Sequence, residues 1–452
     1  MKNKLLFIIP IVFFCFSCKK DWLEEKQDIK LIVPTTLNDL DLLLNVNEFQ
    51  YDGRGAGETS CDDYEFTLEQ FNQLNWGFDR DFITWKKDRN LDNLPIQQNE
   101  WKCAYTQIQI CNVVLKKLVN VSRTEKNKND YDRIYGTALY HRAKQFLNMV
   151  MSFSKYYDKT TSNVDLGIPL KLDDDISEEI KRATVEQTYR QIIEDLKISA
   201  QNLPVSQVDY SRVAKGGAFA LLARTFLFMD QYGEAKRMAD SSLKYHSFIQ
   251  DFNLITNLNG SRPLNLQSKE IHVRGIMVKP SSNASTGRIN SSLYGQYEQN
   301  DLRKTLFFRN EQDGKVTFRG HFMNNLFTGT TTAEVLLILA ECKARLGDTN
   351  GALQALNTLE IRRYKKTEFI PFTASNEHEA LKIILKERRK ELLTRGLRWQ
   401  DLKRLNRDPE FAQTLVRKIG NETYSLSPND SKYVLPIPQF VVNFNKVKQN
   451  EY

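Results

Sequence analysis

The sequence predicts a mostly α-helical protein, in which packed helix pairs carry long irregular loops. Apolar residues recur at steps of three and four in several segments, which is the spacing of one helix face. Two segments, 220–239 and 337–356, repeat one arrangement of leucine and alanine around a short polar turn. Between them, residues 246–333 lose this periodicity and are rich in Asn, Ser, Gly and Thr, which is typical of loops. Residues 50–98 are interpreted in the same way, and long irregular segments often bind ligands.

The N-terminal segment has the pattern of an export signal. Two lysines, Lys2 and Lys4, precede an apolar run from Leu5 to Ser17. The run is shorter than the roughly 20 apolar residues that span a bilayer, so residues 1–17 are predicted to be a cleaved signal peptide.

The residue after this run, Cys18, is the predicted lipidation site. The junction resembles the lipobox of bacterial lipoproteins, whose cysteine is acylated, although Cys15 and Phe16 replace the usual aliphatic and small residues. Each buried methylene of an acyl chain adds about 0.8 kcal/mol of membrane affinity, so several chains anchor a protein stably. The mostly charged residues 19–25 would form a polar tether. The alternative is an ordinary secretory signal in which Cys18 has no role.

The composition argues against several function classes. The net charge of +8 falls to +6 without Lys2 and Lys4, and no basic run is interleaved with aromatic residues as nucleic-acid binding needs. The charged run 386–390 is expected to be a solvated helix face. The cysteines after Cys18 are interpreted as buried thiols, since even Cys103 and Cys111 lie about 12 Å apart along a helix.

Several helices can be bounded from local patterns. Helical spacing predicts helices over 101–115 and 132–157, whereas proline makes 166–170 extended. A capping box formed by Thr184 and Gln187 begins a helix that reaches Pro204.

The two repeated segments resemble tetratricopeptide hairpins. Each places a Leu-Ala pair twelve residues before a second alanine, and these residues are Leu222, Ala223 and Ala235 in the first and Leu339, Ala340 and Ala352 in the second. Small residues at these points let two antiparallel helices approach closely. Two copies 117 residues apart are not a regular array.

The C-terminal region is predicted to contain one long helix and an extended tail. The helix starts at Asn376 with Glu379 completing a capping box, bends at Gly396 and stops at Asp408 and Pro409. In the tail, 433–452, two prolines two residues apart are taken to rule out a helix.

Segments along nearly the whole chain resemble the SusD/RagB lipoproteins. ERRKELLTRGLRWQDLKRL (387–405) resembles the C-terminal signature of this family, and the tail 433–452 resembles its closing segment, departing from it at Val441, Val442 and Phe444. The segment DWLEEK behind Cys18 also agrees with the family.

The resemblance implies a surface-exposed lipoprotein of the outer membrane, built on four tetratricopeptide-like helix pairs. Its parts would be the signal peptide, an N-terminal part over 18–230 and a C-terminal part over 231–452, packed as one body. It would capture a nutrient, usually an oligosaccharide, and deliver it to a TonB-dependent, SusC-like β-barrel transporter. No enzymatic activity and no cofactor are implied.

The residues themselves also argue against catalysis. The five histidines are scattered, and none has the spacing of a metal site. Glu387, Glu391 and Asp401 could serve as the acid/base set of a glycosidase, but arginines crowd them and favour a charge-paired helix surface. GRGAG (53–57) resembles a phosphate loop, lacks a preceding strand and is interpreted as a flexible turn.

Sugar capture requires flat apolar faces flanked by hydrogen-bonding side chains. The candidate ligand-binding residues are Trp76, Phe78, Asp79, Arg80 and Trp85. The alternative is that these aromatics pack into the core, as is expected of Trp101 and Trp399. Two other functions stay open, namely a scaffold that binds proteins through its helical hairpins and a surface glycosidase with two carboxylates across a cleft. A nutrient other than a carbohydrate, such as a peptide, also stays open.

Overall fold

The computed structural model describes residues 34–451, apart from 75–76, 88, 90–91, 93–98, 176, 178–179, 259, 262, 265–266, 279–286 and 323–325. The predicted signal peptide, Cys18 and the tether lie outside the described residues, as does Trp76.

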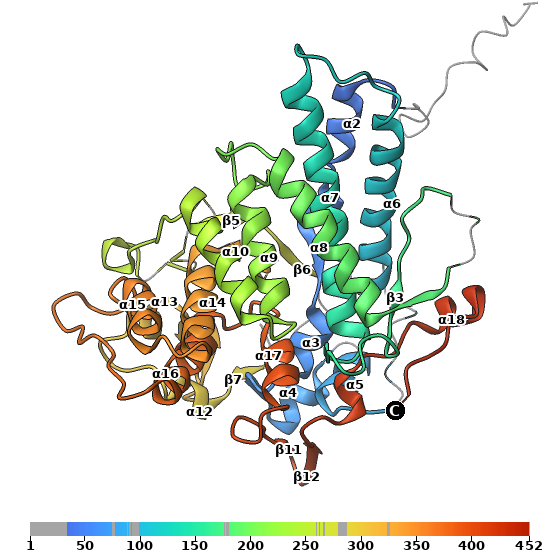
Figure 1. The fold of residues 1–452 in the computed structure, drawn as a ribbon. Coiled ribbons are helices and arrows are strands. Elements are labelled where there is room, and N and C mark those ends of the chain that lie inside the picture. The colour runs from blue at the N-terminus through green and yellow to red at the C-terminus, as the bar shows by residue number, and fades with distance from the viewer. Residues whose placement is uncertain are drawn as a thin grey trace, which may run out of the picture.

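Eight long helices form the body of the molecule (Figure 1). They are α6 (Glu100–Leu118), α7 (Lys128–Phe153), α8 (Val185–Asn202), α9 (Lys215–Leu227), α10 (Tyr232–Tyr245), α14 (Thr332–Arg345), α15 (Thr349–Glu360) and α16 (Glu377–Glu391). From α6 to α10 each helix packs on the next, α14 packs on α10, and α15 and α16 pack on α14. The predicted mostly helical, tetratricopeptide-like fold is confirmed.

Local signals account for the ends of these helices. The predicted capping box at the start of α8 is present, since Thr184 Oγ1 accepts from Gln187 N and Gln187 Oε1 accepts from Thr184 N. The predicted helices over 101–115 and 132–157 are α6 and α7. The repeated segments are the pairs α9 with α10 and α14 with α15. The alanines that the pattern identified are 0% exposed, so the helices of each pair approach closely.

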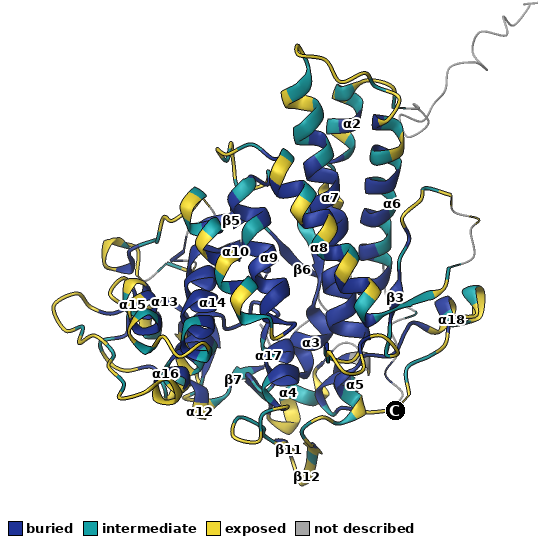
Figure 2. Cartoon of the chain, viewed as in Figure 1, coloured by how far each residue is buried: buried dark blue, intermediate teal, exposed yellow. Residues whose placement is uncertain are grey.

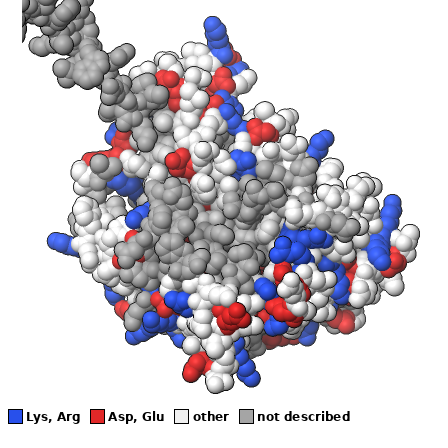
Figure 3. Space-filling model, turned by 180° about the vertical axis from the view of Figure 1, so that it is seen from behind, with Lys and Arg blue, Asp and Glu red and all other residues white. Residues whose placement is uncertain are grey.

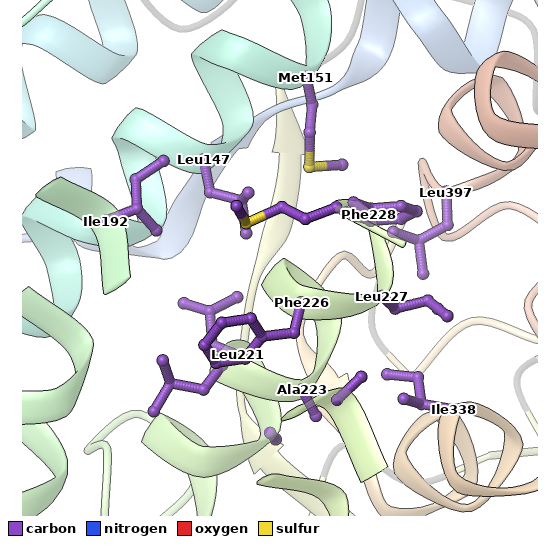
Figure 4. Close-up of a cluster of buried hydrophobic side chains, with 14 of the residues drawn as sticks. Leu147, Met151, Ile192, Leu221, Ala223, Phe226, Leu227, Phe228, Ile338 and Leu397 are labelled. Atoms are coloured by element: carbon purple, nitrogen blue, oxygen red, sulfur yellow. The ribbon is translucent and has the colours of Figure 1, made fainter. Parts of the chain in front are cut away.

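One hydrophobic cluster extends from Ala56 to Val447 and fills the space between the helices. Figure 4 shows side chains of α7, α8, α9 and α14 meeting there, among them Leu147, Ile192 and Leu221. In the ribbon of Figure 2, buried residues (dark blue) predominate on the inner sides of these helices. Burying one such leucine contributes about 1.5–3 kcal/mol. Because the cluster contains buried residues from both halves of the chain, it holds the two halves together. Residue 230, the predicted boundary between the N-terminal and C-terminal parts, lies between α9 and α10.

In the described part of the chain, six two-stranded sheets organise the connecting segments. The pairs are β1 (Tyr51–Gly53) with β6 (Ile276–Val278), β2 (Tyr64–Glu65) with β7 (Arg288–Ile289), β3 (Leu166–Pro169) with β4 (Arg182–Thr184), β5 (Ile271–Val273) with β10 (Thr330–Thr331), β8 (Phe308–Asn310) with β9 (Val316–Phe318), and β11 (Leu415–Ile419) with β12 (Glu422–Leu426). Among the strand pairs of the described residues, only β1 and β6 run parallel. Two of these pairs join the segments 50–98 and 246–333, which thus form a second packed layer with its own hydrophobic cluster.

Short helices complete the described chain. They are α2 (Leu37–Leu43), α3 (Gly55–Ser60), α4 (Leu68–Asn72), α5 (Gly77–Ile83), α12 (Ser291–Tyr294), α13 (Leu302–Leu306), α17 (Arg398–Leu405) and α18 (Gln439–Asn445), with 3₁₀ turns η2 (Asn47–Gln50), η4 (Phe252–Leu254) and η5 (Ser431–Tyr433). The segment GRGAG does follow a strand, β1, and enters the buried helix α3, so its interpretation as a flexible turn without a preceding strand is wrong.

Two predictions at the C-terminal helix need correction. Asn376 Oδ1 caps Glu379 N, but the Glu379 carboxylate accepts from Ser375 N, so the capping box is incomplete. The helix ends at Glu391 and does not merely bend at Gly396, whose φ of +68° belongs to the left-handed region that favours glycine.

The tail prediction was also wrong. The helix α18 begins directly after Pro438, which occupies the N-cap, where its missing N–H costs no helical hydrogen bond.

In the described part of the chain, no helix combines the length and the apolar character needed to cross a bilayer. On the face shown in Figure 3, basic and acidic side chains lie close to one another over the described surface.

Candidate ligand-binding site

A pocket of about 560 Å³ opens beside the C-terminal end of α7. Its walls come from residues 155–166, the end of α17, the segment 429–434 and the tail 448–451. These segments meet near the C-terminus in Figure 1. The volume falls within the range of about 300–1,000 Å³ that is typical of small-ligand sites.

Hydrogen bonds join the C-terminal end of α7 to α17 beside the pocket. Lys403 of α17 is buried and donates from Nζ to the carbonyl oxygens of Met151 and Ser154, both at 2.7 Å. These carbonyls have no partner within the helix, because the last turn of a helix leaves its acceptors free. Lys403 therefore caps α7, and burial of its ammonium lowers the pKa of Lys403 to about 7.

The tail is fixed to the same helix end. Leu435 N donates to Ser152 O at 2.9 Å, and Asn450 Nδ2 donates to Phe153 O at 2.9 Å. The last residues of the described chain are thus positioned by a helix that ends almost 300 residues earlier, since the Asn450 bond spans 297 residues.

Two tyrosines, Tyr156 and Tyr433, line the pocket. The Tyr433 ring lies 4.6 Å from that of Trp399, measured between centroids, and burial raises the pKa of Tyr433 to about 12, an effect that Asn406 partly opposes. Tyr156 donates to Asp230 Oδ1 at 3.0 Å, and the Arg407 guanidinium lies 5.3 Å from the centre of its ring.

Ion pairs hold the rim. Each joins a rim carboxylate to a neighbouring cation, and the pairs are Lys155 with Asp165 at 2.8 Å, Arg407 with Asp158 at 2.7 Å, Lys448 with Glu451 at 2.9 Å and Lys432 with Asp430 at 3.7 Å. The rim is therefore electrically balanced and polar, with Val164 and Leu166 adding apolar surface.

The residues predicted to bind a ligand lie elsewhere. Phe78 and Asp79 belong to α5, where the Phe78 side chain is outside the described part and Asp79 is 0% exposed. Arg80 is half-buried and donates to Leu74 O at 3.1 Å. None of these described residues lines the pocket.

Trp85 is buried, at 2% exposure, which favours the core-packing alternative for this residue. Its Nε1 donates to Ser60 O at 2.9 Å, and the Arg417 guanidinium lies 4.9 Å from its ring centre. Trp101 and Trp399 are core residues as expected, at 4% and 1% exposure.

The three carboxylates considered for catalysis are charge-paired but not on a surface. Glu387 contacts Arg303 Nη2 at 2.6 Å, Glu391 contacts Arg363 Nη2 at 2.8 Å and Asp401 contacts Arg388 Nε at 2.9 Å. Their exposures are 1%, 3% and 6%. The expected helix surface is an interior network, because Arg303 and Arg363 come from other parts of the chain and pack over it, whereas Asp401 pairs with the nearby Arg388.

The charged run 386–390 was also predicted to be a solvated helix face, and this prediction was wrong for part of the run. Lys390 within it is 0% exposed and pairs with Asp301 at 2.8 Å, so this face of α16 is not solvated as expected.

Three side chains present atoms close enough to share a metal ion, namely Glu58, Cys61 and Asp63, within 4.8 Å of one another. Glu58 already accepts from the Tyr64 hydroxyl, and Asp63 pairs with Arg389. Burial raises the pKa of the Cys61 thiol well above its usual value, which disfavours the thiolate that a metal needs. The described cysteines are all free and buried, as the sequence predicted.

Two regions of the chain match models of known protein families. Residues 21–227 match the model of a family described as starch-binding and associating with the outer membrane, and residues 332–452 match the model of the SusD family. No curated protein sequence matches the chain.

Solved structures with the same fold include three from Bacteroides. A putative sugar binding protein from Bacteroides vulgatus is 21% identical, with a TM-score of 0.73 over 93% of this chain and 99% of that one. A SusD superfamily protein from Bacteroides thetaiotaomicron is 20% identical, with a TM-score of 0.72 over 92% and 100%. A SusD-like carbohydrate binding protein from Bacteroides vulgatus is 19% identical, with a TM-score of 0.67 over 91% and 97%.

Proposed function

The chain belongs to the SusD/RagB family, and we propose that it is a lipid-anchored protein that captures an oligosaccharide outside the cell and delivers it to a TonB-dependent, SusC-like transporter. The observation that carries this proposal is the pair of family matches, which together span residues 21–227 and 332–452. The family description supplies association with starch and with the outer membrane.

Features of the chain itself bear on the anchoring and sugar-binding parts of the proposal. Residues 1–17 are a signal peptide and Cys18 carries the acyl anchor, while 18–230 and 231–452 form one body. The pocket beside α7 offers polar groups and apolar patches at one opening, as recognition of a sugar ring requires. The charge-paired state of Glu387, Glu391 and Asp401 supports binding without catalysis.

The first test isolates the tagged protein from mildly solubilised outer membranes. A stoichiometric β-barrel transporter is expected to co-purify. Its absence from preparations with the lipoprotein intact would contradict delivery and favour the scaffold function.

The second test replaces the predicted anchor. Cys18→Ser should move the protein from the outer-membrane fraction to a soluble fraction, whereas Cys15→Ser should leave it in the membrane. Retention of the Cys18→Ser protein in the membrane would contradict the anchor.

A further inference from the structure

We propose that the pocket beside α7 is a subsite for an acidic sugar residue, whose carboxylate is bound by the Lys403 ammonium. This inference rests on the proposed carbohydrate capture and adds to it the class of sugar.

Lys403 is a buried cation without a carboxylate partner among the described residues. It is 6% exposed, and its two hydrogen bonds go to main-chain oxygens. Two other buried lysines differ, since Lys144 pairs with Asp52 at 2.9 Å and Lys390 pairs with Asp301 at 2.8 Å. Buried charges are ordinarily paired, so the floor of this pocket lacks a counterion.

The rim does not supply the missing charge. Its carboxylates each pair with a rim cation or with Lys432, as described above. The phenols of Tyr156 and Tyr433 are neutral at physiological pH, since burial raises the pKa of both. Lys403 is therefore the lining cation that no carboxylate of the described residues contacts, and a ligand carboxylate would give it an anionic partner.

The helix end compensates Lys403 in part. The C-terminus of α7 carries about half a negative charge, and its carbonyls take two of the three N–H groups of the ammonium. About half a positive charge and one N–H group remain for a ligand. Because Val164 and Leu166 also line the pocket, a sugar ring would find apolar contacts beside the carboxylate site.

The test compares two trisaccharides of the same linkage by titration calorimetry at pH 6. One is built of galacturonic acid and the other of galactose. The unaltered protein should bind the acidic trisaccharide at least tenfold more tightly. Lys403→Met should abolish this preference, whereas Lys382→Met, which removes an exposed lysine outside the pocket, should retain it.

A pH series on the unaltered protein does not depend on the folding of a variant. Affinity for the acidic trisaccharide should fall as the pH rises through the pKa of Lys403 in the complex, while affinity for the neutral one stays constant. Equal affinities for the two sugars, no binding of either, or an acidic preference that survives in Lys403→Met would each overturn the inference. Co-purification of a transporter would still decide the proposed function separately.

Discussion

Arg303 is expected to be among the most sensitive positions for stability. Its side chain is 0% exposed and contacts four carboxylates, namely Asp301 at 2.9 Å, Glu360 at 2.9 Å, Glu387 at 2.6 Å and Glu391 at 3.2 Å. Arg303→Met keeps much of the side-chain volume and removes the charge, so it tests the electrostatic contribution of this residue.

The magnitude follows from the charges that remain. Counting Glu270, which pairs with Arg363, five carboxyl groups share three cations, Arg303, Arg363 and Lys390. Burial raises the pKa of Glu360 well above its usual value, so Glu360 is counted as a neutral acid. Removing one partner of a buried pair costs about 3–5 kcal/mol, because the other charge stays buried without compensation. Native proteins are stable by only about 5–15 kcal/mol, so this loss would be a large part of the total.

The assay is urea unfolding at pH 7, followed by circular dichroism. The matched control is Arg309→Met, which removes an arginine whose side chain is 66% exposed and paired with Glu311, and which should cost less than about 1 kcal/mol. If Arg303→Met lost no more than Arg309→Met, the network would not depend on ionised carboxylates and the reasoning would be refuted.

Three further predictions concern stability. Burial and the neighbouring carboxylates raise the pKa of Glu360 well above its usual value. The folded protein therefore keeps a proton on Glu360 that the unfolded chain loses above about pH 4.5. Because of this difference, the free energy of unfolding falls as the pH rises through the pKa of Glu360 in the folded protein. Glu360→Gln removes this loss. The free energy of unfolding of the variant minus that of the unaltered protein should therefore be larger at pH 8 than at pH 4. The same difference at both pH values would contradict a protonated Glu360. Gly396→Ala should destabilise by more than Gly314→Ala, since both have positive φ but a Cβ on Gly396 would lie 2.8 Å from Arg54 Cβ, whereas one on Gly314 meets nothing within 4 Å; thermal unfolding of the two variants compares them, and equal losses would refute the steric contribution. Leu222→Ala should lower the free energy of unfolding by about 2–5 kcal/mol, because Leu222 is 0% exposed within the main cluster; a loss below about 1 kcal/mol in urea unfolding would mean that the site collapses around the cavity.

Local patterns predicted the helices where the deciding interactions are themselves local. Thr184 caps a residue three positions away, and the alanines of the two hairpins face a neighbouring helix across a short turn. Two of the errors had different local causes. Ser375 takes the Glu379 carboxylate that Asn376 was expected to share, and Pro438 starts a helix that proline was taken to forbid.

At the candidate site, the sequence and the tertiary structure point to different residues. Aromatic content suggested Trp85, yet its indole is satisfied inside the core by Ser60, 25 residues away. Lys403 carried no signal in the sequence, because its significance depends on Met151, 252 residues away, and on the absence of a nearby carboxylate among the described residues.

By itself, the sequence determined the helical fold, its paired helices and the family to which the chain belongs, since periodicity, caps and motifs are written in neighbouring residues. Only the tertiary structure decided which charges are buried and which of them lack a counterion. Burial depends on segments that meet across the fold, and the same Glu or Lys is a solvated surface group or an interior charge according to what packs over it.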